Sequence, residues 1–348
     1  MKKIINTFSL QGGKHCITNS LKQIFDFYNI TISEEMLFGI ASGLSFLYIN
    51  QASSPMICGR VKVFEFEKKL AQRLNITIKC KSGKNYLKIH QVTKKLINQN
   101  TPVLIYVDMS YLDYLGLDKN NHFGGHAIVL FGFDDETRQY YLSDRDNHDF
   151  PIRVPYGQIQ ISNDYHLASY DEIEKARNSS FRPFPAKNKY LIFDFAGYNG
   201  IDKKTILEAI HETCLTMLNP PAQLLGINGI KKFSKEILKW KKFSSSKLCL
   251  ACITNYFQIS KDGGTGSGIF RKMYGEFLIE SAAIVKDERF ISIGEEFINI
   301  SKSWDKIADL LWQISLDGKT ERLEQISTLI LKIYENEKSL YLKLEKII

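Results

Sequence analysis

Three residues have the types and the local settings that cysteine catalysis requires: Cys16, His126 and Asp144. A thiol becomes a nucleophile when its pKa falls, and a helix N-terminus beside an imidazole lowers it. The run Gly-Gly-Lys-His at 12–15 predicts a tight loop before Cys16, and apolar residues at helical spacing over 21–28 predict a helix that begins near it. The other five cysteines have no such setting. The sequence therefore predicts Cys16 as the nucleophile.

An imidazole partner has to be held by an acceptor, and a predicted hairpin supplies one. Residues 126–133 form the first expected strand, 134–137 the turn and 139–144 the return strand. A register centred on that turn places His126 opposite Asp144, with Cβ atoms about 5 Å apart. Asp146 lies diagonally and is the weaker candidate. We therefore expect His126 and Asp144 to share a hydrogen bond.

Two points about this group of residues remain open in the sequence. Gln11 either places its amide in an oxyanion hole with the backbone N–H of Cys16, or is an ordinary polar loop residue. The cysteine, the histidine and the aspartate could also be unrelated, with no shared site. Because all three have suitable local contexts, we favour the catalytic interpretation.

The pattern of expected elements predicts an α+β fold in two domains. In the first part, Ser33 is an expected N-cap, with Glu34 and Glu35 in the first turn of its helix. Helical periodicity dominates after about residue 198, where strand signals almost vanish. We therefore predict a catalytic domain over 1–198 and an all-helical domain over 199–348. The remaining elements expected in the first domain are helices at 63–74, 89–99 and 169–177 and strands at 103–107 and 189–195.

Composition restricts the classes of function. The 348 residues are 44% hydrophobic and 24% charged, values of an ordinary globular protein, which excludes a disordered or fibrous chain. The net charge of +8 is spread over both halves, which argues against a basic nucleic-acid-binding tail. The sequence has neither an apolar run of 18 residues nor a signal-peptide core, so the prediction is a cytoplasmic protein without a membrane span.

The second half contains two groups with competing interpretations. The CxxC pair Cys249 and Cys252, with His211 and Cys214 upstream, has zinc-ligand spacing, but its apolar surroundings favour buried core cysteines and no metal. The 3-4 apolar repeat over 323–347, interrupted at Glu337, favours packing within a helical bundle over a homodimer seam.

Lysines are concentrated between 231 and 242, and glycines between 263 and 268. The lysines form either the solvated face of a helix or a docking patch for an acidic partner. The glycine run lacks the GK[ST] ending of a P-loop, so it does not predict nucleotide binding. It is either a flexible loop that starts a helix, or a lid or phosphate-facing helix N-terminus. The lysines concerned are Lys231, Lys232, Lys235, Lys239, Lys241 and Lys242.

The order of the motifs resembles known families. Cys16, then Gly-Gly-His-Ala-Ile-Val-Leu-Phe-Gly-Phe-Asp at 124–134 and Leu-Ser-Asp at 142–144, resembles the papain-like fold of bacteriocin-leader-cleaving peptidases. The first half is similar to the N-terminal domain of the butirosin biosynthesis protein H family. The residues that carry this similarity are His15-Cys16, Met-Leu-Phe-Gly at 36–39 and Gly-Leu-Ser-Phe at 43–46. The second half resembles that family's helical companion domain at 226–230, 238–240 and 263–274.

The resemblance implies a papain-like cysteine acyltransferase of antibiotic-type secondary metabolism. Such an enzyme takes an acyl group from the phosphopantetheine thioester of an acyl carrier protein and forms an amide with a small-molecule primary amine. It implies that Cys16 attacks the thioester while His126, oriented by Asp144, moves protons, with no resident cofactor. Carrier proteins are acidic as a class, so Lys231, Lys232, Lys235 and Lys239 would complement one. Ile17 departs from the glycine that usually follows the cysteine in the peptidases.

Two alternative functions use the same residues. A papain-like peptidase or amidase requires the same three side chains and differs only in transferring the acyl group to water. A non-catalytic binding protein on the same fold would be favoured if Cys16 were buried or distant from His126.

Overall fold

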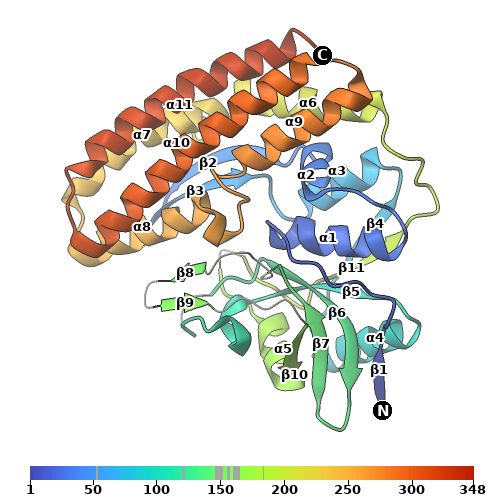
Figure 1. Cartoon of the computed structure of the whole chain (residues 1–348). Coiled ribbons are helices and arrows are strands. Elements are labelled where there is room, and N and C mark those ends of the chain that lie inside the picture. Colours follow the sequence, from blue (N-terminus) through green and yellow to red (C-terminus); the bar gives the residue numbers. More distant parts are fainter. Residues whose placement is uncertain (52–53, 120–121, 146–151, 155–156, 160–164, 183) are drawn as a thin grey trace. The chain divides into compact units, whose positions relative to one another are not determined.

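The structure, a computed structural model, describes residues 1–51, 54–119, 122–145, 152–154, 157–159, 165–182 and 184–348. The chain forms two compact units, whose elements are labelled in Figure 1. Unit 1 consists of Met1–Leu37 and Asn75–Tyr198. Unit 2 consists of Phe38–Leu74 and Asn199–Ile348. Each unit is thus made of two separate stretches of sequence.

Unit 1 is built on a sheet in which every described strand pair is antiparallel. The strand order is β10-β7-β6-β5-β11-β4, and β1 pairs with the far end of β6. All residues of β5 and β6 are buried, which explains their continuous apolar sequence and confirms the predicted buried strand at 103–107. The strands are β1 (Lys2–Ile4), β4 (Thr77–Lys81), β5 (Val103–Val107), β6 (His126–Asp134), β7 (Gln139–Ser143), β10 (His166–Ser169) and β11 (Tyr190–Asp194).

Helix α1 (Cys16–Phe27) packs against β6 and β5 and begins at the residue that the sequence predicted. Leu21, Ile24 and Phe25 of its predicted apolar stripe are fully buried, whereas Tyr28, which caps the end of the helix, is 37% exposed. The predicted N-cap of α2 (Glu34–Ile40) is also confirmed, because Ser33 Oγ accepts the Met36 N–H at 2.9 Å. The other elements of unit 1 are α4 (Tyr86–Asn98), α5 (Tyr170–Asn178), the short 3-10 helices η1 (Met109–Tyr111) and η2 (Asp113–Leu115), and the strand pair β8 (Ile152–Val154) and β9 (Gly157–Ile159).

Unit 2 combines a bundle of helices with one β-hairpin that the sequence did not predict. The hairpin strands β2 (Leu44–Asn50) and β3 (Pro55–Arg60) pack on α7 and α8 respectively. The Asn255 side chain on α8 accepts the Ile57 N–H at 2.9 Å and donates to the Pro55 carbonyl at 2.8 Å. The helices are α3 (Glu65–Arg73), α6 (Lys203–Leu218), α7 (Gly226–Glu236), η3 (Ile237–Lys242), α8 (Ser245–Ile259), η4 (Lys261–Gly263), α9 (Arg271–Val285), α10 (Arg289–Asp317) and α11 (Arg322–Glu345).

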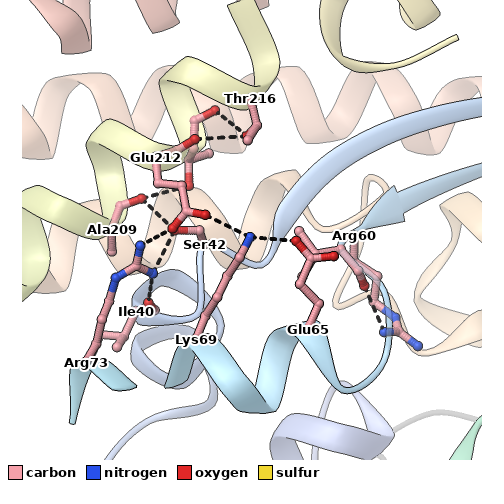
Figure 2. A network of polar contacts seen from close by, with 11 residues as sticks. Ile40, Ser42, Arg60, Glu65, Lys69, Arg73, Ala209, Glu212 and Thr216 are labelled. Atoms are coloured by element: carbon pink, nitrogen blue, oxygen red, sulfur yellow. Dashed lines mark hydrogen bonds and ion pairs between the residues drawn. The ribbon is translucent and has the colours of Figure 1, made fainter. Parts of the chain in front are cut away.

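Residues 38–74 therefore pack with the helices, whereas the predicted division assigned them to the first domain. Figure 2 shows one cause, a polar network centred on Glu212 of α6. Its carboxylate pairs with Arg73 and, at 3.0 Å, with Lys69, both on α3. Arg73 also donates to the Ile40 carbonyl and, at 2.8 Å, to Ser42 Oγ.

Residues 199–348 contain helices and no strand, as the periodicity indicated.

The apolar repeat over 323–347 packs inside unit 2. Six of its residues are at most 1% exposed, so the stripe is covered by the bundle, as the favoured interpretation predicted. The interruption at Glu337 has a structural cause, since this buried carboxylate forms a two-pronged ion pair with Arg271 at 2.8 and 3.0 Å. Trp304 Nε1 donates to the same carboxylate at 3.1 Å. The six buried residues are Leu323, Ile326, Ile330, Ile333, Leu340 and Leu344.

The chain has a mixed α and β fold, and its antiparallel sheet and many helices are compatible with the predicted α+β class. The papain-like character of unit 1 stays a prediction. Within the described part of the chain, no helix combines the length and the apolar character needed to cross a membrane.

Candidate active site

The structure brings the three predicted residues together in unit 1. Cys16 is the first residue of α1, His126 is the first residue of β6, and Asp144 directly follows β7. All three are buried, with exposed fractions of 6%, 3% and 5%. His126 Nε2 lies 2.7 Å from Asp144 Oδ2, and Cys16 forms a hydrogen bond with the same imidazole. Because Nε2 faces Asp144, Nδ1 is the ring nitrogen that remains for Cys16.

The register that was predicted to pair His126 with Asp144 is wrong, although the pair itself forms. Val129 lies opposite Ser143, and the register shifts between Leu130 and Gly132, where the hairpin contains a bulge. This register is displaced by two residues from the predicted one. A two-residue displacement keeps side chains on the same face of the sheet, so His126 reaches Asp144 diagonally. The weaker candidate, Asp146, lies outside the described residues.

Electrostatics favour a proton on His126 and a charge on Asp144. Burial lowers the pKa of His126, but the Asp144 carboxylate and the hydrogen bonds to Asp144 and Cys16 outweigh it and raise that pKa to about 10. Burial raises the pKa of Asp144, but the facing imidazolium and the neighbouring Arg145 outweigh it and lower that pKa to about 2. A protonated imidazole next to a thiol favours the thiolate, the form that attacks carbonyl carbon.

Two further donors hold Asp144 in place. The Tyr114 hydroxyl, on η2, donates to Asp144 Oδ2 at 2.8 Å, and the Arg145 N–H donates to Oδ1 at 2.6 Å. The Tyr114 ring stacks on His166 of β10, with centroids 4.0 Å apart. Sequence reasoning missed Tyr114, because it precedes Asp144 by 30 residues and no local pattern connects the two.

Helix α1 is fixed to the sheet that carries the other two residues. Ser20 Oγ donates to the Ala127 carbonyl at 3.2 Å, next to His126 in β6. Ser143 Oγ, next to Asp144 in β7, donates to Gln23 Oε1 on α1 at 2.6 Å. These two buried contacts fix the position of the nucleophile helix relative to the imidazole and the carboxylate.

Gln11 does not join this group. Its amide donates to Asp26 Oδ2 at 3.0 Å and accepts a hydrogen bond from Lys22. Asp26 lies ten residues beyond Cys16 on α1, which is about 15 Å along the helix. The interpretation of Gln11 as an ordinary polar loop residue therefore agrees with the structure, and the oxyanion-hole role is not supported. The backbone N–H of Cys16, at the helix N-terminus, is the donor that remains from the original prediction.

A second imidazole–carboxylate pair lies in unit 1, although no motif predicted a partner for His122. His122 Nδ1 lies 2.9 Å from Asp108 Oδ2 and 2.9 Å from Ser110 Oγ. Asp108 also accepts hydrogen bonds from Ser179 Oγ at 2.5 Å and from the Phe123 N–H at 2.9 Å. Among the described residues, the hydrogen-bond partners of this pair include no cysteine, so the pair has the proton-holding part of the first site without the nucleophile.

The cysteines of unit 2 differ from Cys16 in their environment. Cys214 on α6 and Cys252 on α8 are fully buried, and burial raises the pKa of each thiol to about 12. These two thiols are therefore neutral at ordinary pH, which agrees with the core interpretation, whereas Cys249, the other member of the CxxC pair, is only half-buried. Among the described residues, no group of three or more His, Cys, Asp or Glu side chains is arranged to hold a metal ion.

The glycine-rich run 263–268 is anchored within unit 2. Thr265 Oγ1 donates to the carbonyls of Ile259 and Ser260 at 2.7 and 2.9 Å. Asp305 accepts the Gly268 N–H at 2.8 Å and a hydrogen bond from Ser267. These contacts argue against a flexible loop or a lid. The interpretation of this run as a phosphate-facing helix N-terminus stays a prediction.

Comparison with known families identifies the chain. Residues 15–145 match the family described as butirosin biosynthesis protein H, N-terminal, which spans Cys16, His126 and Asp144. Residues 15–145 belong to the butirosin biosynthesis protein H N-terminal family. Residues 171–344 match a second family, a domain of unknown function called DUF4872. No curated protein shows significant similarity to this chain.

The boundaries of the two family matches differ from those of the two compact units. The first match includes residues 38–74, which pack in unit 2, and the second begins at α5 in unit 1. Elements of each matched segment therefore contribute to both units.

Proposed function

We propose that this protein is a cysteine acyltransferase that moves an acyl group from a carrier-protein thioester to a primary amine in antibiotic-type biosynthesis. The observation that carries the proposal is the contact of one imidazole, His126, with both the Cys16 thiol and the Asp144 carboxylate. Membership of residues 15–145 in the butirosin biosynthesis protein H N-terminal family supports a biosynthetic role over a digestive one. The papain-like fold is part of this proposal.

In the first step, the Cys16 thiolate attacks the carbonyl carbon of the thioester. The bond from that carbon to the phosphopantetheine sulfur breaks, and the departing sulfur takes the proton from His126. The products are an acyl-Cys16 thioester and the free thiol of the carrier arm. We expect the backbone N–H of Cys16 to donate to the oxygen on which negative charge develops.

In the second step, the amine attacks acyl-Cys16, and His126 accepts the proton that the nitrogen loses. Part of the raised pKa of His126 comes from Cys16, so acylation removes that part, lowers the pKa and favours the neutral imidazole, which can accept a proton. Asp144 remains charged and keeps the ring oriented. The Cys16 thiolate then leaves, the amide is released, and the enzyme returns to its starting charge state.

The direct test is formation of an acyl-enzyme. The protein is incubated with an acyl-carrier thioester, and intact mass is compared for wild type, Cys16→Ala and Cys80→Ala. Cys80 is an exposed cysteine and serves as the matched control. We expect one acyl adduct on wild type and on the Cys80 variant and none on the Cys16 variant. No adduct on wild type with any acyl thioester would contradict the proposal.

The same experiment separates the alternatives. A papain-like amidase would lose the adduct to water as fast as to added amines, whereas an acyltransferase releases it faster as the amine concentration rises. A binding protein would take up no acyl group. Cys16 is only 6% exposed, one of the two features that favoured a binding protein, but its contact with His126 favours catalysis.

The carrier protein is proposed to dock on the lysine-rich surface of α7 and η3. Lys231, Lys235 and Lys239 are exposed there, and Lys232 is half-buried. Two lysines of this surface are partly neutralised, since Lys239 pairs with Glu236 at 2.7 Å and Lys241 pairs with Glu324 at 2.7 Å. The surface would attract an acidic carrier mainly by raising its association rate.

Charge reversal tests this docking surface. Lys235→Glu with Lys239→Glu should lower kcat/KM for the carrier thioester about tenfold at low salt, and less at high salt. The same pair should leave kcat/KM for a free pantetheine thioester unchanged. Lys302→Glu with Lys306→Glu, on exposed positions of α10, is the matched control. An equal loss of kcat/KM with the carrier thioester and with the free pantetheine thioester would count against docking on this surface. An equal loss in the two double variants would do the same.

A further inference from the structure

The N-terminus of the nucleophile helix is capped by a carboxylate from another element. Glu34, the first residue of α2, accepts the Lys14 N–H on Oε1 at 2.8 Å and the His15 N–H on Oε2 at 3.1 Å. Oε2 also accepts the Thr18 hydroxyl at 2.6 Å. Helix α1 itself supplies neither an acidic residue in its first turn nor a side-chain cap. The residues that flank Cys16 on both sides are therefore held by Glu34.

The surrounding chain makes room for this carboxylate. A Cβ added to Gly13 would lie 2.4 Å from Glu34 Oε1 and 2.4 Å from Asn19 Nδ2. Only glycine at this position lets the loop pass so close to Glu34 without displacing it. Glu34 is 6% exposed, and burial raises its pKa, while the bonds from Thr18, Lys14 and His15 act in the opposite direction.

The charge of Glu34 opposes that of the nucleophile. The N–H groups at a helix N-terminus favour a thiolate, and a carboxylate that accepts the N–H groups just before the helix offsets part of this effect. The neighbouring Glu35 differs, because it faces Lys14 Nζ at 2.5 Å and is partly exposed. The donors to the Glu34 carboxylate are the Thr18 hydroxyl at 2.6 Å and the backbone N–H groups of Lys14 and His15 at 2.8 and 3.1 Å, all of them neutral.

We propose that Glu34 is the positioning residue of the Cys16 nucleophile: it fixes the backbone that leads into α1 and keeps the thiol less acidic than the helix N-terminus alone would make it. This inference rests on the proposed function, in which Cys16 must alternate between attacking and leaving. A thiolate of moderate basicity is the better nucleophile toward a thioester, since nucleophilicity falls as the pKa falls.

The test is the pH dependence of Cys16 alkylation by iodoacetamide in the full chain. The thiolate displaces iodide, and trypsin then releases residues 15–22, between Lys14 and Lys22, for quantification by mass spectrometry. Glu34→Gln should lower the alkylation midpoint by about one pH unit, because a buried like charge near the thiolate is removed. Glu35→Gln makes the same charge change one residue away and should leave the midpoint within about 0.3 units of wild type.

An unchanged Glu34→Gln midpoint, or equal shifts in both variants, would overturn the proposal. If Glu34→Gln does not fold, Gly13→Ala tests the same contact by displacing the carboxylate, and it should move the midpoint in the same direction by a smaller amount. A midpoint unchanged in Gly13→Ala would then contradict the proposal. Alkylation needs no acyl donor, so failure to form an acyl-enzyme and failure of this inference give separate results.

Discussion

Two imidazole–carboxylate pairs of similar geometry and different surroundings lie among the described residues of unit 1; His126 is buried, whereas the His122 side chain is 16% exposed. In His126–Asp144 the carboxylate faces Nε2 at 2.7 Å, and in His122–Asp108 it faces Nδ1 at 2.9 Å. Val107 is the β5 partner of His126, and Asp108 is the next residue along an extended chain. Side chains alternate along extended backbone, so the two pairs lie on opposite faces of the sheet.

The two carboxylates are kept ionised by different groups. Burial raises the pKa of Asp108, but hydrogen bonds from Ser179, Ser110 and the Phe123 N–H outweigh it and lower that pKa. The pKa of Asp144 is lowered chiefly by the charge of His126. Asp108 is thus satisfied by neutral donors that bind three chain segments together, whereas Asp144 depends on a proton that His126 holds.

This difference teaches that an imidazole–carboxylate contact does not by itself identify a catalytic site. The pair at His126 is next to a thiol at a helix N-terminus, and its carboxylate takes most of its stabilisation from the imidazole. The pair at His122 ties the segment before β6 to the end of β5. We therefore interpret the first pair as chemical and the second as structural.

The largest expected effect comes from removing each imidazole. His126→Ala should lower the rate of amide formation by about 10⁴-fold, because no other group moves the protons. His122→Ala should leave the rate per folded molecule within about threefold of wild type and lower the thermal midpoint instead. Steady-state kinetics with parallel thermal unfolding measure both. A large rate loss in His122→Ala would remove the distinction between the pairs.

A smaller effect is expected from the carboxylates. Asp144→Asn should lower the rate by about 10²-fold, because the carboxylate acts through the imidazole and transfers no proton. Asp108→Asn replaces an acceptor with a donor among buried hydroxyls and should cost about 1–3 kcal/mol of unfolding free energy with little change in rate. Urea unfolding and kinetics on the two variants give the comparison. A large loss of rate in Asp108→Asn, with only a loss of stability in Asp144→Asn, would reverse our assignment.

The pairs should also differ in how stability depends on pH. The pKa of His126 is raised from 6.5 to about 10 on folding, so its contribution is complete below pH 6.5 and disappears as pH rises through 10. The contribution of Asp144, whose pKa falls from 3.8 to about 2, is present above 3.8 and disappears as pH falls through 2. Unfolding free energy should therefore decline between pH 6.5 and 10 in wild type and Asp108→Asn, and much less in Asp144→Asn. Parallel curves for all three proteins would contradict this assignment.

The smallest effect concerns single hydroxyl donors. Tyr114→Phe removes the hydrogen bond to Asp144 Oδ2 and should lower the rate about three- to tenfold, the equivalent of one hydrogen bond. Ser110→Ala removes a donor to Asp108 and should change stability by about 1 kcal/mol with an unchanged rate. Rates measured at equal folded fractions test both, and a Tyr114→Phe enzyme as fast as wild type would reduce Tyr114 to a packing role.

Local signals predicted the parts of the fold that local physics determines. The start of α1 at Cys16, the Ser33 cap and the buried strand at 103–107 follow from apolar spacing and capping chemistry, and each is confirmed. The hairpin β2–β3 was missed because its strands pack on α7 and α8, more than 150 residues away, and their own sequence does not show this.

The sequence by itself determined the types of the reacting residues and the ends of the elements that carry them. It placed a cysteine at a helix start and a histidine at a strand start, because both positions depend on neighbouring residues only. The tertiary structure alone decided that His126 reaches Asp144 across a bulged register, that Gln11 turns toward Asp26, and that Tyr114 and Glu34 support the site. These contacts join residues distant in the chain, and their geometry depends on how the elements pack.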